Sequence, residues 1–219
     1  MKQRLTAKGW RGLLLAALGV FAGGVGIAAA AVPTGNLIKN SGGETNPASV
    51  DGNDNIDIPL WDDRGMFTVV EYGAPGFPTE AQAAMIGGGN DLFAGGPSGG
   101  QNVAVQRSVL PARAFADVDS GAVNARLSGY LGGFASQGDN MVVQALFKSA
   151  EDTTLGQVKI GPVTPEQREG VTTLLPRART AGVPIGTRSI LFRQVATRLS
   201  GTYNDGYADN LNLRLTIPD

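Results

Sequence analysis

Apolar and polar residues alternate with a period of two through most of the chain after residue 35, which is typical of strands that bury one face. The last segment shows this most clearly, because Leu211, Leu213 and Leu215 share one face and polar residues lie between them. Residues 123–131 alternate in the same way. The pattern therefore predicts a β-rich chain in which each strand turns one face towards a core.

Six further stretches are predicted as strands, since they are rich in β-branched and aromatic residues and are separated by Gly, Pro, Asn and Asp. They are Phe67–Tyr72, Asn102–Val109, Met141–Lys148, Leu155–Ile160, Val171–Leu175 and Ser189–Leu199. Two short helical pieces are expected, one over Thr79–Ile86 and one beginning at Thr164, where Pro165 and Gln167 are typical of a first turn. With roughly eight strands, the fold class is all-β, and we expect a jelly-roll β-sandwich of two antiparallel sheets.

Two stretches without periodicity, residues 41–59 and 87–100, are predicted as loops because they are polar or rich in glycine. Loops of this length are uncommon in a compact domain and tend to carry function.

The first 31 residues have the organisation of a secretory signal peptide. Residues 1–11 carry four positive charges and no acid, residues 12–32 are uncharged and apolar, and Ala28–Ala31 offers a cleavage site of small residues. We therefore expect a signal peptide over residues 1–31, one domain over residues 32–219, and a secreted protein with no stable membrane insertion after cleavage. The alternative is an uncleaved anchor, since about 20 apolar residues can cross a bilayer, but the segment is rich in Gly and Ala.

The charge and the cysteine content of the chain limit the classes of partner and anchor that we expect. Removal of the four early cations leaves 14 Lys and Arg against 19 Asp and Glu, so the net charge becomes 14 − 19 = −5. An acidic domain is poorly suited to a phosphate backbone, so no nucleic-acid partner is expected. The chain has no cysteine, which excludes disulfides and a lipid anchor on a cysteine.

Catalytic groups are scarce. The string G-x-S-x-G over Gly96–Gly100 lacks a histidine base, because the chain contains no His. Without His or Cys, the usual ligands of catalytic zinc are also missing. We therefore expect a protein that is not an enzyme. A hydrolase remains an alternative through three acid pairs in turn-like contexts, which are Asp62/Asp63, Asp117/Asp119 and Glu151/Asp152.

Both ends of the mature chain resemble a known fold family. The segment Asn36–Glu44 reads N-L-I-x-N-x-G-x-E and, followed by Trp61, resembles the opening of galactose-binding-domain-like sandwiches, which include many non-catalytic carbohydrate-binding modules. The segment Asp205–Leu213 resembles their closing strand. The middle is similar to secreted bacterial proteins of this fold with no assigned activity, over Phe67–Gly73, Gly87–Asn90, Phe93–Pro97 and Gly132–Asn140.

This resemblance implies that the first and last strands lie side by side and that a structural Ca²⁺ sits where they meet. The early acid and the late acid of the family pattern correspond to Glu44 and Asp209. Ca²⁺ takes six to eight oxygen ligands, which two carboxylates and loop carbonyls can largely supply. Gly43 departs from the pattern, because an aromatic residue commonly precedes the Glu. The alternative is two exposed turn carboxylates.

Sugar binding by such modules depends on aromatic rings that stack on sugar faces. Tyr130 lies on the polar side of its strand and Tyr203 lies in a turn, so both are ligand-binding candidates, whereas Trp61 and Phe67 are expected in the core. The alternative for both tyrosines is partial burial with a satisfied hydroxyl.

These observations favour a secreted, non-catalytic binding module for an extracellular glycan, another extracellular ligand or a cell-surface component. The alternative is a structural or interaction protein of the cell envelope without a small-molecule ligand.

Overall fold

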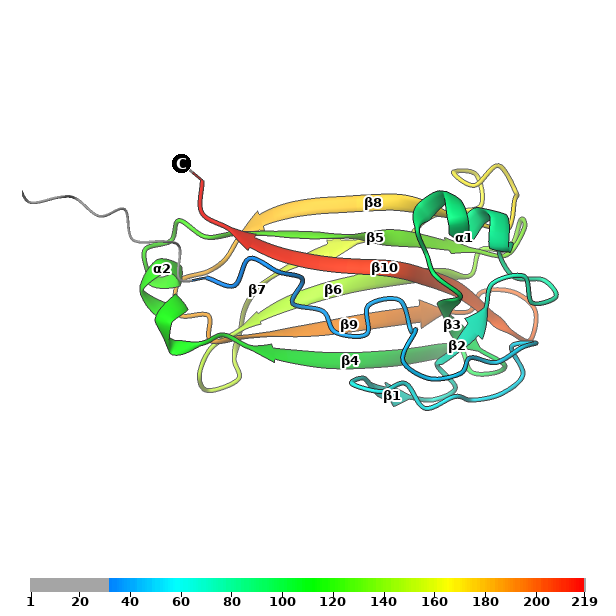
Figure 1. Ribbon diagram of the computed structural model, residues 1–219, viewed down its shortest axis with the longest axis horizontal. Coiled ribbons are helices and arrows are strands. Elements are labelled where there is room, and N and C mark those ends of the chain that lie inside the picture. Colours follow the sequence, from blue (N-terminus) through cyan, green and yellow to red (C-terminus); the bar gives the residue numbers. More distant parts are fainter. Residues whose placement is uncertain (1–31, 219) are drawn as a thin grey trace, which may run out of the picture.

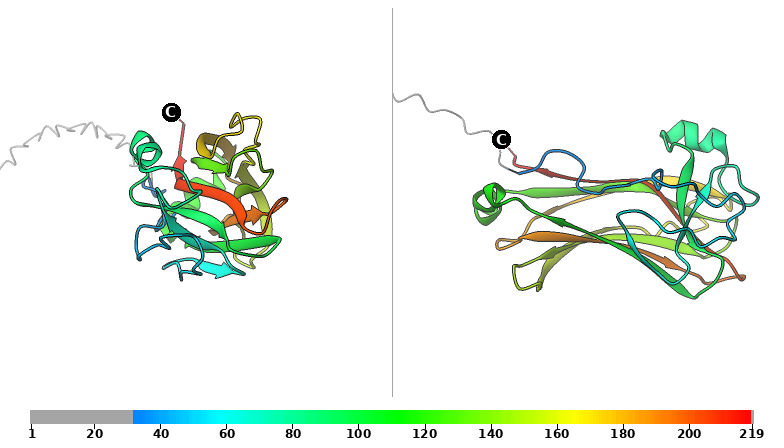
Figure 2. Two further views of the ribbon diagram at one scale, coloured as in Figure 1. Left: turned by 90° about the vertical axis from the view of Figure 1, so that its right-hand side faces the viewer. Right: turned by 60° about the horizontal axis from the view of Figure 1, so that its bottom comes forward.

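The computed structural model describes residues 32–218, so the predicted signal peptide lies outside the described residues. Two antiparallel sheets of five strands pack face to face, and Figure 2 shows the two layers edge on. Their strand orders are β1-β4-β9-β6-β7 and β2-β3-β10-β5-β8. The strands are β1 (Asp62–Arg64), β2 (Thr68–Glu71), β3 (Asp91–Gly96), β4 (Gln101–Val109), β5 (Asn124–Gly133), β6 (Asn140–Lys148), β7 (Thr154–Ile160), β8 (Thr173–Gly182), β9 (Ser189–Thr197) and β10 (Asn204–Thr216). The predicted all-β sandwich is confirmed.

The strand prediction is wrong in three places, and the first is β1, which was not predicted. Residues 87–100, predicted as a loop, contain β3, whose glycines weaken its strand signal. The strand predicted to end at Leu175 continues through Pro176 to Gly182. Proline is tolerated there because β8 is an edge strand of its sheet, where a missing N–H on the solvent side removes no hydrogen bond between strands.

The helices are short. Helix α1 (Glu80–Ile86) begins as predicted, because Thr79 accepts a hydrogen bond from the Gln82 N–H and the Gln82 side chain accepts one from the Thr79 N–H. The same reciprocal pair forms between Thr164 and Gln167, yet the segment makes only turns before Gly170, so the second helical prediction is wrong. A 3-10 turn (Ala112–Ala114) and α2 (Phe115–Asp119) were not predicted. Among residues 32–218, no helix is long and apolar enough to span a bilayer.

The main core lies between the sheets. Leu211, Leu213 and Leu215 of β10 are buried there with Phe93 and Phe192, as the alternation predicts. Complete burial of one such side chain contributes roughly 1.5–3 kcal/mol to folding. Trp61 and Phe67 also lie in this core, which confirms their predicted burial.

The N-terminal segment runs along the second half of β10, as Figure 1 shows. The Leu37 N–H donates to the Leu213 carbonyl, and the Leu211 N–H donates to the Ser41 carbonyl, both at 3.0 Å. The two ends of the domain are therefore neighbours, as expected. The segment is not a regular strand, however, because the Asn36 side chain makes part of the ladder and Asn40 adopts φ 45°.

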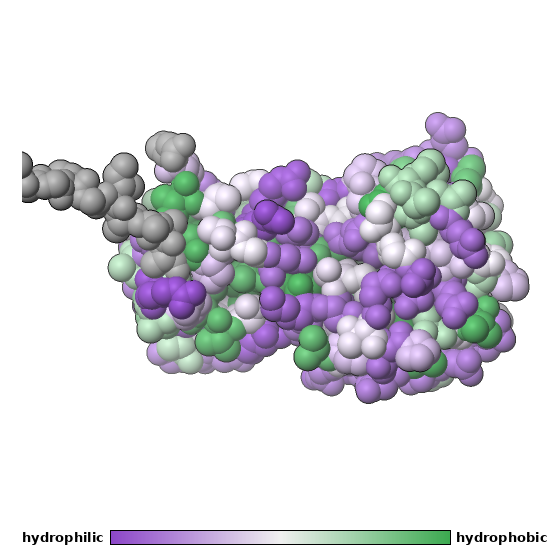
Figure 3. Space-filling view, in the orientation of Figure 1, coloured by the Kyte–Doolittle hydropathy of each residue, from purple (hydrophilic) through white to green (hydrophobic). Residues whose placement is uncertain are grey.

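A second, smaller apolar cluster covers the outer face of the sheet that contains β10. Ala83 of α1 packs there against Tyr72, Leu92, Leu174 and Tyr207. Helix α1 lies over this end of the molecule in Figure 1, and Figure 3 shows a weakly apolar area at the same place. Helix α1 and this outer cluster bury polar side chains that would otherwise face solvent.

Candidate functional site

The first half of β10 carries a row of polar residues on the outer face of its sheet. Asp205, Tyr207 and Asp209 lie there beneath α1 and the neighbouring loops, and all three are at least 93% buried. The Tyr207 hydroxyl donates to Asp205 at 2.5 Å, and the Tyr72 hydroxyl donates to Asp209 at 2.7 Å. The row divides into two candidate sites, one at Asp209 and one at Asp205.

The structure brings the two predicted calcium ligands, Glu44 and Asp209, to the same place. A Cβ atom added to Gly42 would lie 2.9 Å from Asp209 Oδ1 and 3.6 Å from Glu44 Cγ. Gly88 approaches Asp209 and Gly89 approaches Glu44 in the same close manner. The main chain at three glycines therefore lies directly against two carboxylates, which we call the carboxylate pair.

Burial and like charges act together at the carboxylate pair. Burial raises the pKa of Asp209 to about 7, with help from the charges of Glu44 and Asp91 and against the lowering effect of the Tyr72 hydrogen bond. Burial also raises the pKa of Asp91 to about 6, with contributions from Glu44 and Glu71. Bringing these acids together therefore costs free energy at neutral pH, and a bound cation would offset that cost.

The surroundings of Glu44 are acidic, because Glu71, Glu80 and Asp91 line the same cavity. Among the described residues that line the cavity around Glu44, Asn90 and Asp91, none is Lys or Arg. Glu44 already accepts the Asn90 and Asp91 N–H groups at 3.0–3.2 Å, which fixes its carboxylate in place. In residues 32–218, however, no group of three or more His, Cys, Asp or Glu side chains is placed to hold a metal ion. Two carboxylates would need loop carbonyls to complete the shell of a Ca²⁺ ion.

A cavity of about 270 Å³ opens beside Asp205, and we call it the Tyr203 pocket. Its lining includes Asp51, Phe77, Phe134, Gln137, Tyr203 and Asp205. The Phe77 and Tyr203 rings meet edge to face with centroids 5.5 Å apart. Phe77, Phe134 and Tyr203 are all half-buried, so part of each ring remains accessible.

Polar atoms in this pocket lack protein partners. Gln137 Oε1 and the Tyr203 hydroxyl are buried, and neither makes a hydrogen bond with the described residues. Tyr203 is partly buried, as the alternative predicts, but its hydroxyl makes no hydrogen bond with the described residues. Burial raises the pKa of Asp205 to about 6. Buried polar atoms normally find partners, so these two unpaired atoms are an exception that a bound ligand would remove.

A buried arginine holds one wall of the pocket. Arg168 is 2% exposed and donates to the carbonyls of Gly133, Ala135, Gln137 and Val171 at 2.7–2.9 Å. These bonds fix the loop after β5, in which Ala135 adopts φ 39° and which carries Phe134. The pocket wall is thus formed by a rigid loop.

The other tyrosine candidate faces a different cavity. Tyr130 is half-buried and lines a hollow of about 340 Å³ together with Arg126, Pro176 and Arg177. It packs against the same outer cluster as Tyr203 but shares no cavity with it among the described residues. Within residues 32–218, no second ring lines this hollow, so it offers less stacking surface than the Tyr203 pocket.

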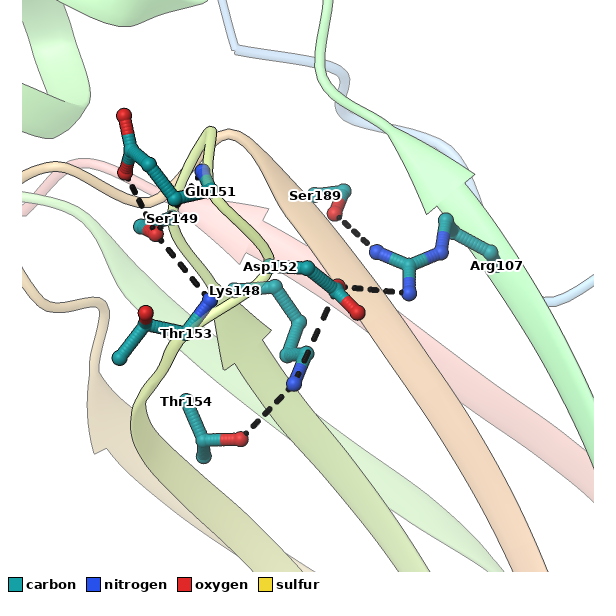
Figure 4. A network of polar contacts seen from close by, with 8 residues as sticks. All are labelled: Arg107, Lys148, Ser149, Glu151, Asp152, Thr153, Thr154 and Ser189. Carbon is teal, nitrogen blue, oxygen red and sulfur yellow. Dashed lines mark hydrogen bonds and ion pairs between the residues drawn. The ribbon is translucent and has the colours of Figure 1, made fainter.

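A wider groove of about 790 Å³ lies on the opposite sheet, with Arg64, Arg107 and Arg193 among its lining residues. Two of these arginines already have partners. Arg107 donates to Asp152 and to Ser189, both at 2.8 Å, as Figure 4 shows. Arg64 pairs with Asp62 at 2.9 Å. Trp61, the one ring among the described residues that line the groove, is 5% exposed, so it provides no stacking platform.

Sequence reasoning missed most of the pocket. Phe134 and Gln137 lie in the loop between β5 and β6, Phe77 lies in another loop, and none of them shares a periodic pattern with Tyr203. Asp205 could have been found from the sequence. It lies at even spacing from Asp209 in a strand-like segment, so the two side chains are expected on the same face.

Comparison with known proteins bears on the fold. No known protein family and no curated protein matches the chain. A cyclase from Fischerella sp. TAU, solved in complex with 4-(1H-indol-3-yl)butan-2-one, matches 85% of this chain and 100% of its own at 15% identity, with a TM-score of 0.57.

Two matches have lower TM-scores. The CBM22-1 xylan-binding domain from Paenibacillus barcinonensis matches 78% of this chain and 94% of its own at 12% identity, with a TM-score of 0.42. The bacteriophage CBA120 tailspike protein 4 matches 83% of this chain at 12% identity and a TM-score of 0.49, and the match spans 21% of the tailspike chain. At its low identity the cyclase likeness shows the fold alone, which is a β-sandwich.

Proposed function

We propose that this chain is a non-catalytic extracellular module that binds carbohydrate in the Tyr203 pocket. The observation that carries the proposal is the combination, in one cavity, of half-buried rings with buried polar atoms that lack partners among the described residues. Sugars offer apolar C–H faces to rings and hydroxyl groups to acceptors such as Asp205 and Gln137.

Size supports a terminal sugar or a short segment of a chain as the ligand. The cavity of about 270 Å³ is slightly smaller than common ligand pockets, which measure about 300–1,000 Å³. Its walls come from fixed elements, because Arg168 holds the Phe134 loop and Phe77 also contacts Tyr207 at 5.4 Å between centroids. A preformed pocket loses little entropy on binding.

The test is retention of the mature domain on polysaccharide gels and glycan arrays, with Tyr203→Ala and Phe134→Ala as site variants. Tyr130→Ala is the matched control, because Tyr130 is also half-buried but lines the other hollow. We expect the site variants to lose about tenfold or more in affinity, the scale of one lost stacking contact. If only Tyr130→Ala loses binding, the ligand binds in the hollow beside Tyr130 and not in the Tyr203 pocket. If the wild type is retained on no glycan, carbohydrate binding is refuted.

The proposal includes a structural Ca²⁺ held by Glu44 and Asp209 with loop carbonyls. The clustered acids, the surrounding glycines and the lack of Lys and Arg among the described lining residues support it. Such an ion would join the N-terminal segment to β10.

Thermal denaturation in Ca²⁺ and in chelator tests this part separately. A ligand that binds only the native state raises the melting temperature in a concentration-dependent way. Glu44→Gln and Asp209→Asn should abolish the rise, whereas Asp62→Asn, on the other sheet, should retain it. A rise that persists in both site variants would show that the ion binds elsewhere.

A further inference from the structure

We propose that the Tyr203 pocket selects a sugar that carries a protonated amine, so that the preferred ligand is an amino sugar in its charged form. This inference rests on the proposed carbohydrate function and names the substrate class of the same site. It follows from the polar groups, the rings and the charges that surround the cavity.

The polar groups of the pocket act as acceptors. Asp51 and Asp205 supply carboxylates, and Gln137 supplies a carbonyl oxygen that has no partner among the described residues. The Tyr203 hydroxyl, likewise without a partner there, can also accept. An ammonium group has three donors and no acceptor, so it can bind several of these acceptors at once. A neutral hydroxyl has one donor and can bind only one of them.

The rings provide a second source of cation affinity. Phe77, Phe134 and Tyr203 border the cavity, and the face of an aromatic ring attracts a cation, more strongly where both are shielded from water. Rings alone would serve a neutral sugar equally well. Rings combined with two carboxylates favour a positive ligand.

The charge balance around the pocket is negative. Its lining within residues 32–218 contains no Lys or Arg, and Asp139 lies behind Asp205, where its carboxylate accepts the Asp205 N–H at 3.0 Å. The nearby cation Arg168 is buried and uses its terminal nitrogens on main-chain carbonyls. A backbone hydrogen bond from Asn53 lowers the pKa of exposed Asp51, and the pKa of Asp205 is about 6, so both acids are charged at neutral pH.

The experiment compares three oligosaccharides of equal length: fully deacetylated chitosan, its N-acetylated counterpart, and an uncharged glucan. Calorimetric titration of the whole mature domain measures each affinity at a pH where the amine is protonated and Asp205, whose pKa is about 6, is still charged. We expect the amine to bind about tenfold tighter than the acetylated form, the scale of one charge-assisted contact. Added salt should weaken only the charged ligand.

Variants separate the charge from the pocket shape. Asp51→Asn should weaken binding of the amine far more than binding of the neutral glucan, and asparagine keeps a side-chain oxygen that can accept the Asn53 N–H. Asp62→Asn serves as the control, because it removes an exposed acid from the opposite sheet. Equal or tighter binding of the acetylated or neutral chain would overturn the amine preference and leave the binding function standing. No binding of any of the three would overturn the amine preference, and the glycan-array experiment above would then decide on carbohydrate binding itself.

Discussion

Buried aspartates dominate the chemistry of this domain at the residue scale. Asp91, Asp205 and Asp209 are at most 7% exposed, and burial raises the pKa of each above the ordinary value of 3.8. Each acid has neighbouring acids, so its charged form is disfavoured twice. The folded state therefore holds protons that the unfolded state releases.

In the presence of chelator, the free energy of unfolding should fall as the pH rises from about 4 to about 7. The unfolded state releases these protons near pH 4, whereas the folded state holds them up to about pH 6–7. A pKa that is higher by one in the folded state than in the unfolded state corresponds to about 1.4 kcal/mol. The melting temperature should drop across this range, and Asp209→Asn should flatten the drop. Thermal denaturation at successive pH values measures it, and a melting temperature that rises over the same range would contradict the prediction.

Arg168→Met should destabilise the fold by about 3 kcal/mol or more, because removal of the buried guanidinium takes the donor away from one buried carbonyl and three partly buried ones. The loop that carries Phe134 should become sensitive to limited proteolysis. Arg179→Met is the control, since Arg179 is exposed on the neighbouring strand β8. Unfolding in denaturant gives the free energy, and equal values for both variants would show that the Arg168 bonds contribute nothing.

At the scale of elements, a bulge in β10 decides where the site lies. The register of β10 against β5 shifts between Asp209 and Asn212, and Asn210 adopts φ 50°. Before the bulge, Tyr207 and Asp209 face the outer cluster. After it, Leu211 faces the main core, although it lies at even spacing from Asp209. One strand therefore serves both the polar site and the apolar core.

Asn210→Ala should cost about 1–2 kcal/mol, because alanine tolerates a left-handed conformation poorly and the variant loses the amide bond to the Ile86 carbonyl. Asn212→Ala, two residues later and beyond the bulge, should cost far less. The free energies of unfolding of the two variants provide the test. Equal costs would mean that the bulge does not depend on Asn210.

At the scale of the whole molecule, the two ends of the domain close one sheet together. Strand β3 covers the first half of β10, and the N-terminal segment takes its place beside the second half. The Asn36 amide donates to the Leu211 carbonyl at 2.8 Å and accepts the Leu213 N–H at 3.0 Å. This closure protects an edge that could otherwise pair with another chain.

Asn36→Ala should lower the free energy of unfolding by about 1–3 kcal/mol and promote association through the exposed β10 edge. Asn46→Ala is the control, because its amide makes one exposed bond to the Asp57 carbonyl. Denaturant unfolding and light scattering read out the two effects. A monomeric variant with unchanged stability would show that the Asn36 bonds are dispensable.

The candidate site is predictable from sequence only in part. A family resemblance nominates Glu44 and Asp209, which lie together in the structure, and a turn position nominates Tyr203, which lines a pocket. Phe134 and Gln137 escape such reasoning, because a loop residue has no periodicity that reveals its neighbours. Tyr130 is an equal candidate in the sequence, yet it lines a hollow with no second ring among the described residues.

The sequence by itself determined the strands and the sandwich, because alternation of apolar residues is a local property that requires a buried face. It also determined the absence of a histidine base and of disulfides. Only the tertiary structure decided which acids are buried, which rings share a cavity, and that a bulge turns Asp209 outwards and Leu211 inwards. Those features depend on contacts between residues far apart in the chain, whose geometry local pattern does not encode.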